Sequence, residues 1–239
     1  MSSAATETPA PSLIARGVAL HKQGKLEQAK NLYEAVLTRD PDHVDALQLL
    51  GTIALQTGRL LEAENLFGRA LRRKPDQVNV LVNLGTVLGR LRKPARALEC
   101  YAKAIALNPA NAEAHFNSGN ILRGLKRTGE ALASYERATS LKPEHAEAWR
   151  QQSGMLSKLG RHAAALACIE RFLALRPAHA GGHNNRGNIL LELQRDAEAV
   201  ESFGQAIALQ PHFAEAHNNR GHALRKLGRT EEALASLDE

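Results

Sequence analysis

The sequence predicts an all-α solenoid built from antiparallel helix pairs, and three observations support that prediction. Proline recurs every 34 residues, at Pro41, Pro75, Pro109, Pro143, Pro177 and Pro211, and a fixed period of this length is typical of a repeat architecture. Only 4% of residues are aromatic, while alanine and leucine are abundant, which favours closely packed helices over strands. With 44% hydrophobic residues, the chain has enough apolar side chains for a continuous core.

The prolines define a repeat frame if each is assigned to position 32. The repeats then start at residues 10, 44, 78, 112, 146, 180 and 214, and the last repeat is incomplete. Helix A is predicted over positions 1–14 and helix B over positions 16–28, with position 15 in the turn. Glycine at position 15 suits a left-handed residue that closes helix A, and the proline prevents helix B from continuing. Residues 1–9 are expected to form a disordered tail.

Three further columns describe how the two helices of a repeat pack. Position 20 is alanine in every repeat, position 8 is glycine except at Ser153, and position 24 is aromatic in five repeats. Small residues at positions 8 and 20 let the helix backbones approach, and the large residue at position 24 fills the remaining space. The aromatic residues are Tyr33, Phe67, Tyr101, Tyr135 and Phe203.

These glycine, alanine, aromatic and proline columns, with Trp149 at position 4, resemble the tetratricopeptide repeat family over residues 10–239. The resemblance implies a right-handed superhelix that binds other polypeptides. Because A helices stack on A helices, they are expected to line the concave side, with the B helices on the convex side. Trp149 is expected in the core. Position 7, usually leucine in the family, is leucine only at Leu50 and Leu84.

Position 6 of helix A carries a column of side-chain amides. An amide has two N–H donors and an acceptor oxygen, so it can pair with the backbone of an extended peptide whatever that peptide's sequence. The structural alternative is that these amides cap or bridge helices, because asparagine has a poor helix propensity. Phe116, at position 5, is a candidate apolar anchor. The candidate peptide-binding residues are Asn83, Phe116, Asn117, Asn120, Gln151, Asn185, Asn188 and Asn219.

The amide column resembles the asparagine ladder of O-GlcNAc transferases, most closely around Ala114–Asn120 and Ala216–Gly221. That resemblance implies that the position 6 asparagines hold substrate backbone, with Gln151 as a variant. It also raises the alternative that this chain is the substrate-recruiting arm of a longer glycosyltransferase. A clamp for acidic C-terminal tails, known in the same family, is disfavoured: Asn188 and Asn219 match it, but Asn184 stands where lysine is required.

Catalytic and metal-binding patterns are not evident in the sequence. There is no glycine-rich phosphate loop after a strand and no nucleophile elbow, so no enzymatic activity and no cofactor are expected. His115, His183 and His217 share position 4 of separate repeats, too far apart for one zinc ion. Cys100 and Cys168 both occupy position 23, two repeats apart, beyond disulfide reach.

The net charge of +6 leaves RNA binding through basic turns as a third, disfavoured function. The basic clusters fall where helices are expected to end, and cations there complement the helix dipole. Sparse aromatic residues also disfavour base stacking.

The sequence has no signal-like leader and no apolar run long enough for a bilayer, so a cytoplasmic protein without membrane contact is expected. The chain stops within the last predicted helix B, which leaves Ala233, Leu234 and Leu237 poorly covered. Such an edge predicts a continuation into a longer protein, or a cover by a partner or by self-association.

Overall fold

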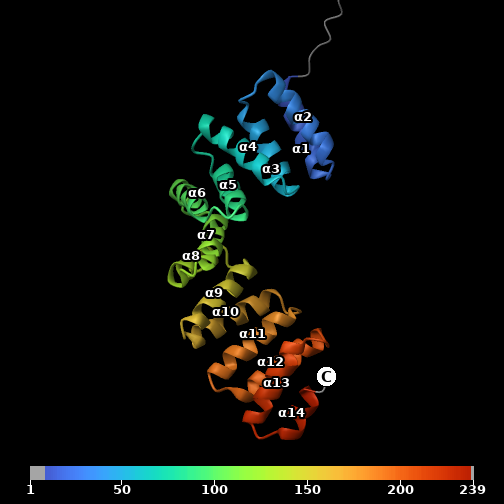
Figure 1. The fold of residues 1–239 in the computed structure, drawn as a ribbon, viewed down its shortest axis with the longest axis vertical. Helices are drawn as coiled ribbons and strands as arrows, with labels where there is room; N and C mark the ends of the chain where they lie inside the picture. Colours follow the sequence, from blue (N-terminus) through green and yellow to red (C-terminus); the bar gives the residue numbers. More distant parts are fainter. Residues whose placement is uncertain (1–8, 238–239) are drawn as a thin grey trace, which may run out of the picture. The chain divides into compact units, whose positions relative to one another are not determined.

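The computed structural model describes residues 9–237, and this part of the chain contains fourteen α-helices and no strand (Figure 1). The predicted all-α repeat fold is therefore confirmed, while residues 1–8 of the predicted tail lie outside the described residues. The helices are α1 (Ala10–Lys22), α2 (Leu26–Arg39), α3 (Val44–Gln56), α4 (Leu60–Arg73), α5 (Val78–Arg90), α6 (Pro94–Leu107), α7 (Ala112–Gly124), α8 (Thr128–Leu141), α9 (Ala146–Lys158), α10 (His162–Leu175), α11 (Ala180–Glu192), α12 (Asp196–Leu209), α13 (Ala214–Lys226) and α14 (Thr230–Leu237).

The odd-numbered helices, called first helices below, begin at position 1 of the 34-residue frame and end at position 13, one residue earlier than predicted. The second helices, which are even-numbered, begin at position 17 and, from α2 to α12, end at position 30 rather than position 28. The later end has a local cause. A proline disfavours helical geometry only in the residue before it, so a helix followed by a proline at position 32 can continue to position 30.

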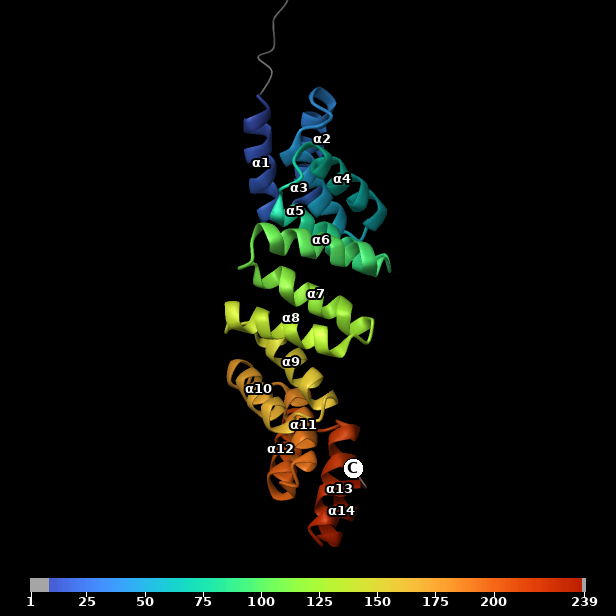
Figure 2. The same cartoon turned by 90° about the vertical axis from the view of Figure 1, so that its left-hand side faces the viewer.

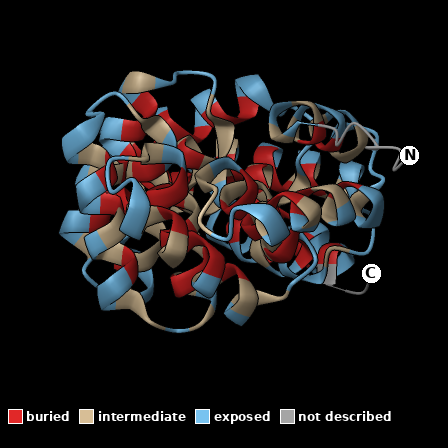
Figure 3. Cartoon of the chain, turned by 90° about the horizontal axis from the view of Figure 1, so that it is seen from above, coloured by how far each residue is buried: buried red, intermediate tan, exposed pale blue. Residues whose placement is uncertain are grey.

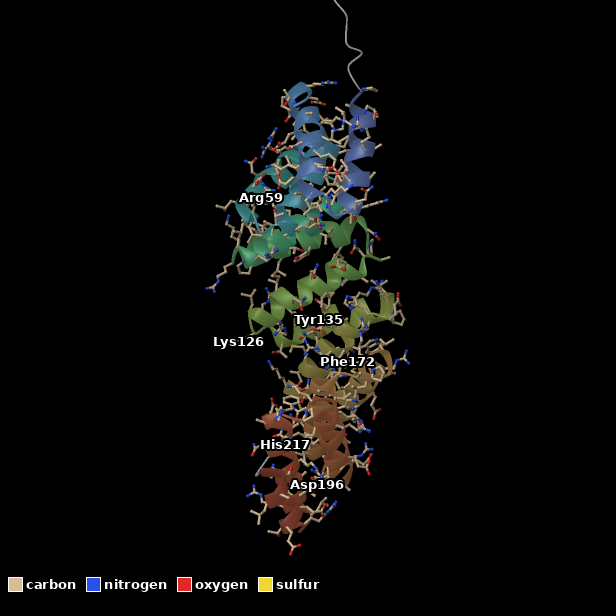
Figure 4. The ribbon with its side chains drawn as sticks, turned by 90° about the vertical axis from the view of Figure 1, so that its right-hand side faces the viewer. Arg59, Lys126, Tyr135, Phe172, Asp196 and His217 are labelled. Carbon is tan, nitrogen blue, oxygen red and sulfur yellow. The ribbon has the colours of Figure 1, made fainter. Side chains whose placement is uncertain are left out.

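The turn inside each pair requires a left-handed residue at position 15. Gly24, Gly58, Gly160 and Gly228 have φ between 71° and 77° there, as predicted. Three other turns use the same geometry without glycine, at Arg92 (φ 58°), Lys126 (φ 60°) and Gln194 (φ 60°). Lys126 is labelled in Figure 4, at the turn that follows α7.

Position 8 is glycine because the position 24 ring of the same repeat lies directly against it. A Cβ atom added at Gly85 would lie 2.6 Å from Cε1 of Tyr101, and one at Gly51 would lie 2.7 Å from Cε1 of Phe67, closer than van der Waals contact allows. The exceptional Ser153 stands opposite a smaller residue, Ile169. Its hydroxyl donates to the Ala165 carbonyl at 2.8 Å.

Two compact units make up the chain, residues 1–121 and 122–239, and the boundary falls within α7. In the described part of the first unit, α1 to α6 pack in chain order, and successive first helices α1, α3 and α5 also touch. In the second unit, α8 to α14 pack in chain order and α11 touches α13 (Figure 2). Buried residues gather where helices face one another and exposed residues lie outside (Figure 3).

Neighbouring repeats are joined by a hydrogen bond that the sequence analysis missed. The ring N–H at position 4 donates to the carbonyl of the proline six residues earlier: the distances are 3.2 Å for His115 to Pro109, 2.8 Å for Trp149 to Pro143, 2.8 Å for His183 to Pro177 and 2.8 Å for His217 to Pro211. Trp149, expected in the core, is only half-buried, since its indole N–H must reach this carbonyl at the turn. The six-residue spacing could have revealed the contact.

None of the helices within residues 9–237 combines the length and apolar character needed to cross a bilayer.

Candidate peptide-binding surface

Three consecutive first helices of the first unit enclose a polar hollow of about 490 Å³, called the first amide hollow below. Helix α5 supplies two of the side-chain amides, Asn79 and Asn83, and the neighbouring helices supply Gln48 and Asn117. The hollow thus collects two members of the predicted position 6 column. The complete lining is Gln48, Asn79, Val82, Asn83, Thr86, Asn111, Glu113 and Asn117.

The amides of this hollow differ in how far they are engaged. Asn117 donates through Nδ2 to Glu113 Oε1 at 3.3 Å, while Asn111 uses Oδ1 to cap α7 by accepting from the Ala114 N–H at 2.8 Å. The side chains of Asn79 and Asn83 make no hydrogen bond to any other described residue. Their donors and acceptors are therefore available to a ligand.

A second amide hollow, of about 260 Å³, lies between α9 and α11 in the second unit. Asn185 and Asn188 line it from α11, and Arg150 and Lys158 line it from α9. Arg150 is also paired with Glu147, to which its Nε donates at 2.9 Å. This hollow is more cationic than the first because Lys158 adds a positive charge beside the amides.

Asn219 bridges two first helices. Its Nδ2 donates to Asn184 Oδ1 at 3.2 Å and to Asn188 Oδ1 at 3.1 Å, and Asn184 Nδ2 donates in turn to Glu215 Oε1 at 2.9 Å. Asn184 is only 2% exposed. Asn219 therefore bridges neighbouring helices, which is the structural alternative to peptide binding for this member of the column.

Gln151 bonds within its own helix, donating through Nε2 to Glu147 Oε1 at 2.6 Å. Burial opposes ionisation of Glu147, but hydrogen bonds from Arg150 and Gln151 hold its pKa below the usual range. Phe116 and Asn120 are half-buried on α7 and neither lines the first amide hollow.

Two amides of the position 6 column are held by a carboxylate four residues earlier in the same helix. Glu113 accepts from Asn117 and Glu147 accepts from Gln151, and residues four apart lie on one helix face. The carboxylate at position 2 could have been recognised from the sequence, because the same spacing occurs in both repeats. It accepts one N–H of the amide in each repeat.

The two cysteines are free and poorly suited to nucleophilic chemistry. Burial raises the pKa of the Cys168 thiol to about 11 and also raises that of Cys100, so both are protonated near neutral pH. Within residues 9–237, no three His, Cys, Asp or Glu side chains form a group that could hold a metal ion. The groups that line the two hollows include amides, hydroxyls and charged side chains, which can form hydrogen bonds with a ligand.

Family models of the same repeat match most of the chain. Two models described as tetratricopeptide repeat match residues 20–84 and residues 82–146 and 156–204, and a third, described as TPR repeat, matches residues 187–228. No curated protein sequence matches the chain.

Solved structures share the fold at low sequence identity. The YrrB structure, described as a TPR protein with an unusual peptide-binding site, is 24% identical with a TM-score of 0.68, covering 72% of this chain and 89% of YrrB. A MamA structure is 21% identical with a TM-score of 0.65, covering 70% of this chain and 92% of MamA. A tetratricopeptide repeat protein from Parabacteroides merdae is 18% identical with a TM-score of 0.68, covering 95% of this chain and 90% of that protein.

Proposed function

This chain belongs to the tetratricopeptide repeat family, and from that premise we propose that it is an interaction scaffold that binds an extended segment of another protein along its first helices. The first amide hollow is the main contact proposed here, and the second amide hollow offers a separate contact of the same kind within the second unit. Asn83, Asn117, Asn185 and Asn188 pair with the peptide backbone in this proposal.

One observation supports the proposal more than any other: Asn79 and Asn83 face a hollow without hydrogen-bond partners among the described residues. Asn83 lies in the interior of α5, where asparagine is unfavourable unless its side chain gains an interaction. Burying either amide under a ligand without hydrogen bonds would cost free energy. A peptide backbone, with alternating N–H and C=O groups, satisfies both ends of each amide.

The repeat spacing suits an extended chain. Adjacent packed helices lie about 10 Å apart, and an extended peptide rises about 3.3 Å per residue. An amide on each successive first helix would therefore meet about every third residue of the ligand. Such contacts read the backbone and leave side-chain preferences to neighbouring groups such as Glu113.

The test replaces the asparagines of the first hollow. The double variant Asn83→Ala, Asn117→Ala should capture fewer proteins from cell extract, with affinity reduced about tenfold if each lost hydrogen bond contributes about 0.7 kcal/mol. Asn65→Ala is the matched control, because Asn65 is an exposed amide on the second helix α4. Unchanged capture by the double variant, with unchanged helical circular dichroism, would refute the proposal.

The finer alternatives remain hypotheses. A role as the recruiting arm of an O-GlcNAc-type transferase would use the same amides, and the sequence resemblance is what supports it. A cytoplasmic location is likewise a proposal from the sequence. RNA binding predicts an affinity that falls steeply with salt concentration, and a filter-binding titration at two salt concentrations tests it.

A further inference from the structure

The second helices of the first unit carry an apolar hollow that the proposed function does not use. It has a volume of about 540 Å³, lies between α4 and α6, and is called the outer groove below. Leu81, Leu84 and Leu88 of α5 form its buried floor. Leu71 of α4 and Cys100 and Leu107 of α6 form its walls, and Leu107 is 45% exposed.

The groove is open because the residue at position 23 is small and the residue at position 7 is apolar. Position 23 is Cys100 here but the larger Leu66 in the preceding repeat, where it is buried. Position 7 is Leu84, which offers no polar group to close the groove. Cys168 also stands at position 23 but is buried, so it is the short Cys100 together with Leu84 at position 7 that leaves apolar atoms without packing partners.

The corresponding places in the second unit are closed by hydrogen bonds. Gln152, at position 7 like Leu84, accepts at 3.0 Å from the hydroxyl of Thr139, which is at position 28 like Leu71. Arg186, also at position 7, donates to the Ser202 hydroxyl at 2.6 Å, and Ser202 stands at position 23 like Cys100. The pair α4 and α6 therefore presents apolar surface where the pairs α8–α10 and α10–α12 of the second unit present polar contacts.

The same part of the chain accounts for the net positive charge of the whole chain. Residues 59–107 contain 10 of the 31 basic residues and only 4 of the 25 acidic residues, which leaves 21 of each elsewhere and assigns the net charge of +6 to this segment. Lys103 lines the groove, and Arg72 lines an adjoining hollow that shares Arg96 with it. Asp76 and Glu99 also line the groove, so its immediate edge carries both charges, while the segment that forms it has an excess of basic residues.

We propose that the outer groove docks an acidic amphipathic helix of a partner protein. The apolar face of that helix fills the space above Leu81, Leu84 and Leu88, as a helix packs into the groove between two others. Carboxylates on its flanks face the exposed Lys103 and Arg72, whose charges attract an acidic partner and favour rapid association. This site is separate from the first amide hollow, which is built from first helices.

The probe is a synthetic 18-residue peptide with leucines at helical spacing on one face and glutamates on the flanks. Matched peptides replace the leucines by serines or the glutamates by lysines. Fluorescence anisotropy with the full chain should show binding of the glutamate peptide that weakens as salt concentration rises. The two matched peptides should bind at least about tenfold more weakly. Equal binding of the serine peptide, or of the lysine peptide, would overturn the proposal.

Variants of the chain locate the contact. Cys100→Leu fills the groove, and the double variant Leu71→Thr, Leu84→Gln copies the Thr139–Gln152 pair; each should weaken peptide binding at least about tenfold, whereas Asn83→Ala should leave it unchanged. In the parent chain, bound peptide should slow alkylation of Cys100, measured by mass spectrometry. Binding unaffected by Cys100→Leu in a variant with intact helical circular dichroism would refute the site. A dimer in light scattering that Cys100→Leu converts to monomer would assign the groove to a second copy and reject the acidic helix.

Discussion

At the residue scale, two tyrosines at the same repeat position have different hydrogen-bond environments. The hydroxyl of Tyr33 is buried without a partner among the described residues, whereas that of Tyr101 lies 3.2 Å from the Thr86 hydroxyl. Burial raises the pKa of both, that of Tyr101 to about 12, so both are neutral near pH 7. Both rings are buried and lie against the position 8 glycine of their repeat, but only one hydroxyl is satisfied.

Replacing these tyrosines by phenylalanine should therefore have opposite effects. Tyr33→Phe should raise the free energy of unfolding by about 1 kcal/mol, because it removes an unsatisfied buried hydroxyl. Tyr101→Phe should lower it by about 0.5–1 kcal/mol, because it removes a hydrogen bond. Urea unfolding followed by circular dichroism measures both, and a loss of stability in Tyr33→Phe equal to that in Tyr101→Phe would contradict this account.

The left-handed turn residues offer a second residue-scale prediction. Lys126 and Gln194 have φ of 60° at position 15, a conformation that costs a side-chain-bearing residue about 1 kcal/mol and glycine little. Lys126→Gly and Gln194→Gly should each raise the thermal unfolding midpoint. Gly58→Ala, at φ 77°, is the reciprocal control and should lower it; a glycine variant that lowers the midpoint would show that other contacts dominate at the turn.

At the element scale, ion pairs connect successive second helices. Glu64 of α4 accepts from Lys93 Nζ at 2.7 Å, just before α6, and from Arg96 Nη1 of α6 at 2.7 Å. The Lys93 hydrogen bond, with help from Arg96 and against the effect of burial, lowers the pKa of Glu64. A carboxylate that is held ionised in this way contributes to stability only while it stays ionised.

Glu64 should therefore stabilise the α4–α6 contact above the pKa of about 4.3 that a glutamate has in the unfolded chain, and lose this contribution as the pH falls through its lower folded value. Urea unfolding between about pH 6 and pH 3 should show a smaller acid-dependent loss of stability in Glu64→Gln than in the parent chain. Glu27→Gln is the control, because Glu27 is exposed and makes no ion pair among the described residues. An equal change in the free energy of unfolding with pH in the parent chain and both variants would contradict the prediction.

Helix pairing itself was predictable because its determinants recur at a fixed spacing. Gly85 and Tyr101 lie sixteen residues apart, and the same separation joins Gly51 to Phe67. The period therefore predicts both the contact and its antiparallel geometry. The predicted helix ends differ from the observed ones by one or two residues. For the second helices the reason is that the position 32 proline leaves position 30 unrestricted.

At the scale of the whole molecule, helices within each unit pack on neighbours in the chain and on the adjacent first helix. Stability in such an array is approximately a sum of repeat and nearest-neighbour contributions. Damage to one pair should therefore remain local.

Gly85→Val tests this locality, because its side chain would collide with Tyr101. Hydrogen exchange read by mass spectrometry should show lost protection in α5, α6 and adjacent helices and unchanged protection from α11 to α14. Uniform loss of protection along the chain would indicate global cooperativity. Gly154→Ala is a matched control, since nothing lies within 4 Å of a Cβ at that glycine.

The sequence alone determined the helix pairs, the left-handed turns at glycine and the small-to-large packing within each repeat, because each depends on residues at fixed short separations. It also placed the amide column on the first helices. Only the tertiary structure separated the open amides from the bridging ones: Asn83 faces a hollow, whereas Asn219 is held by Asn184 and Asn188 on another helix. It likewise decided that the outer groove is open, since that depends on the sizes of side chains from three helices meeting at one place.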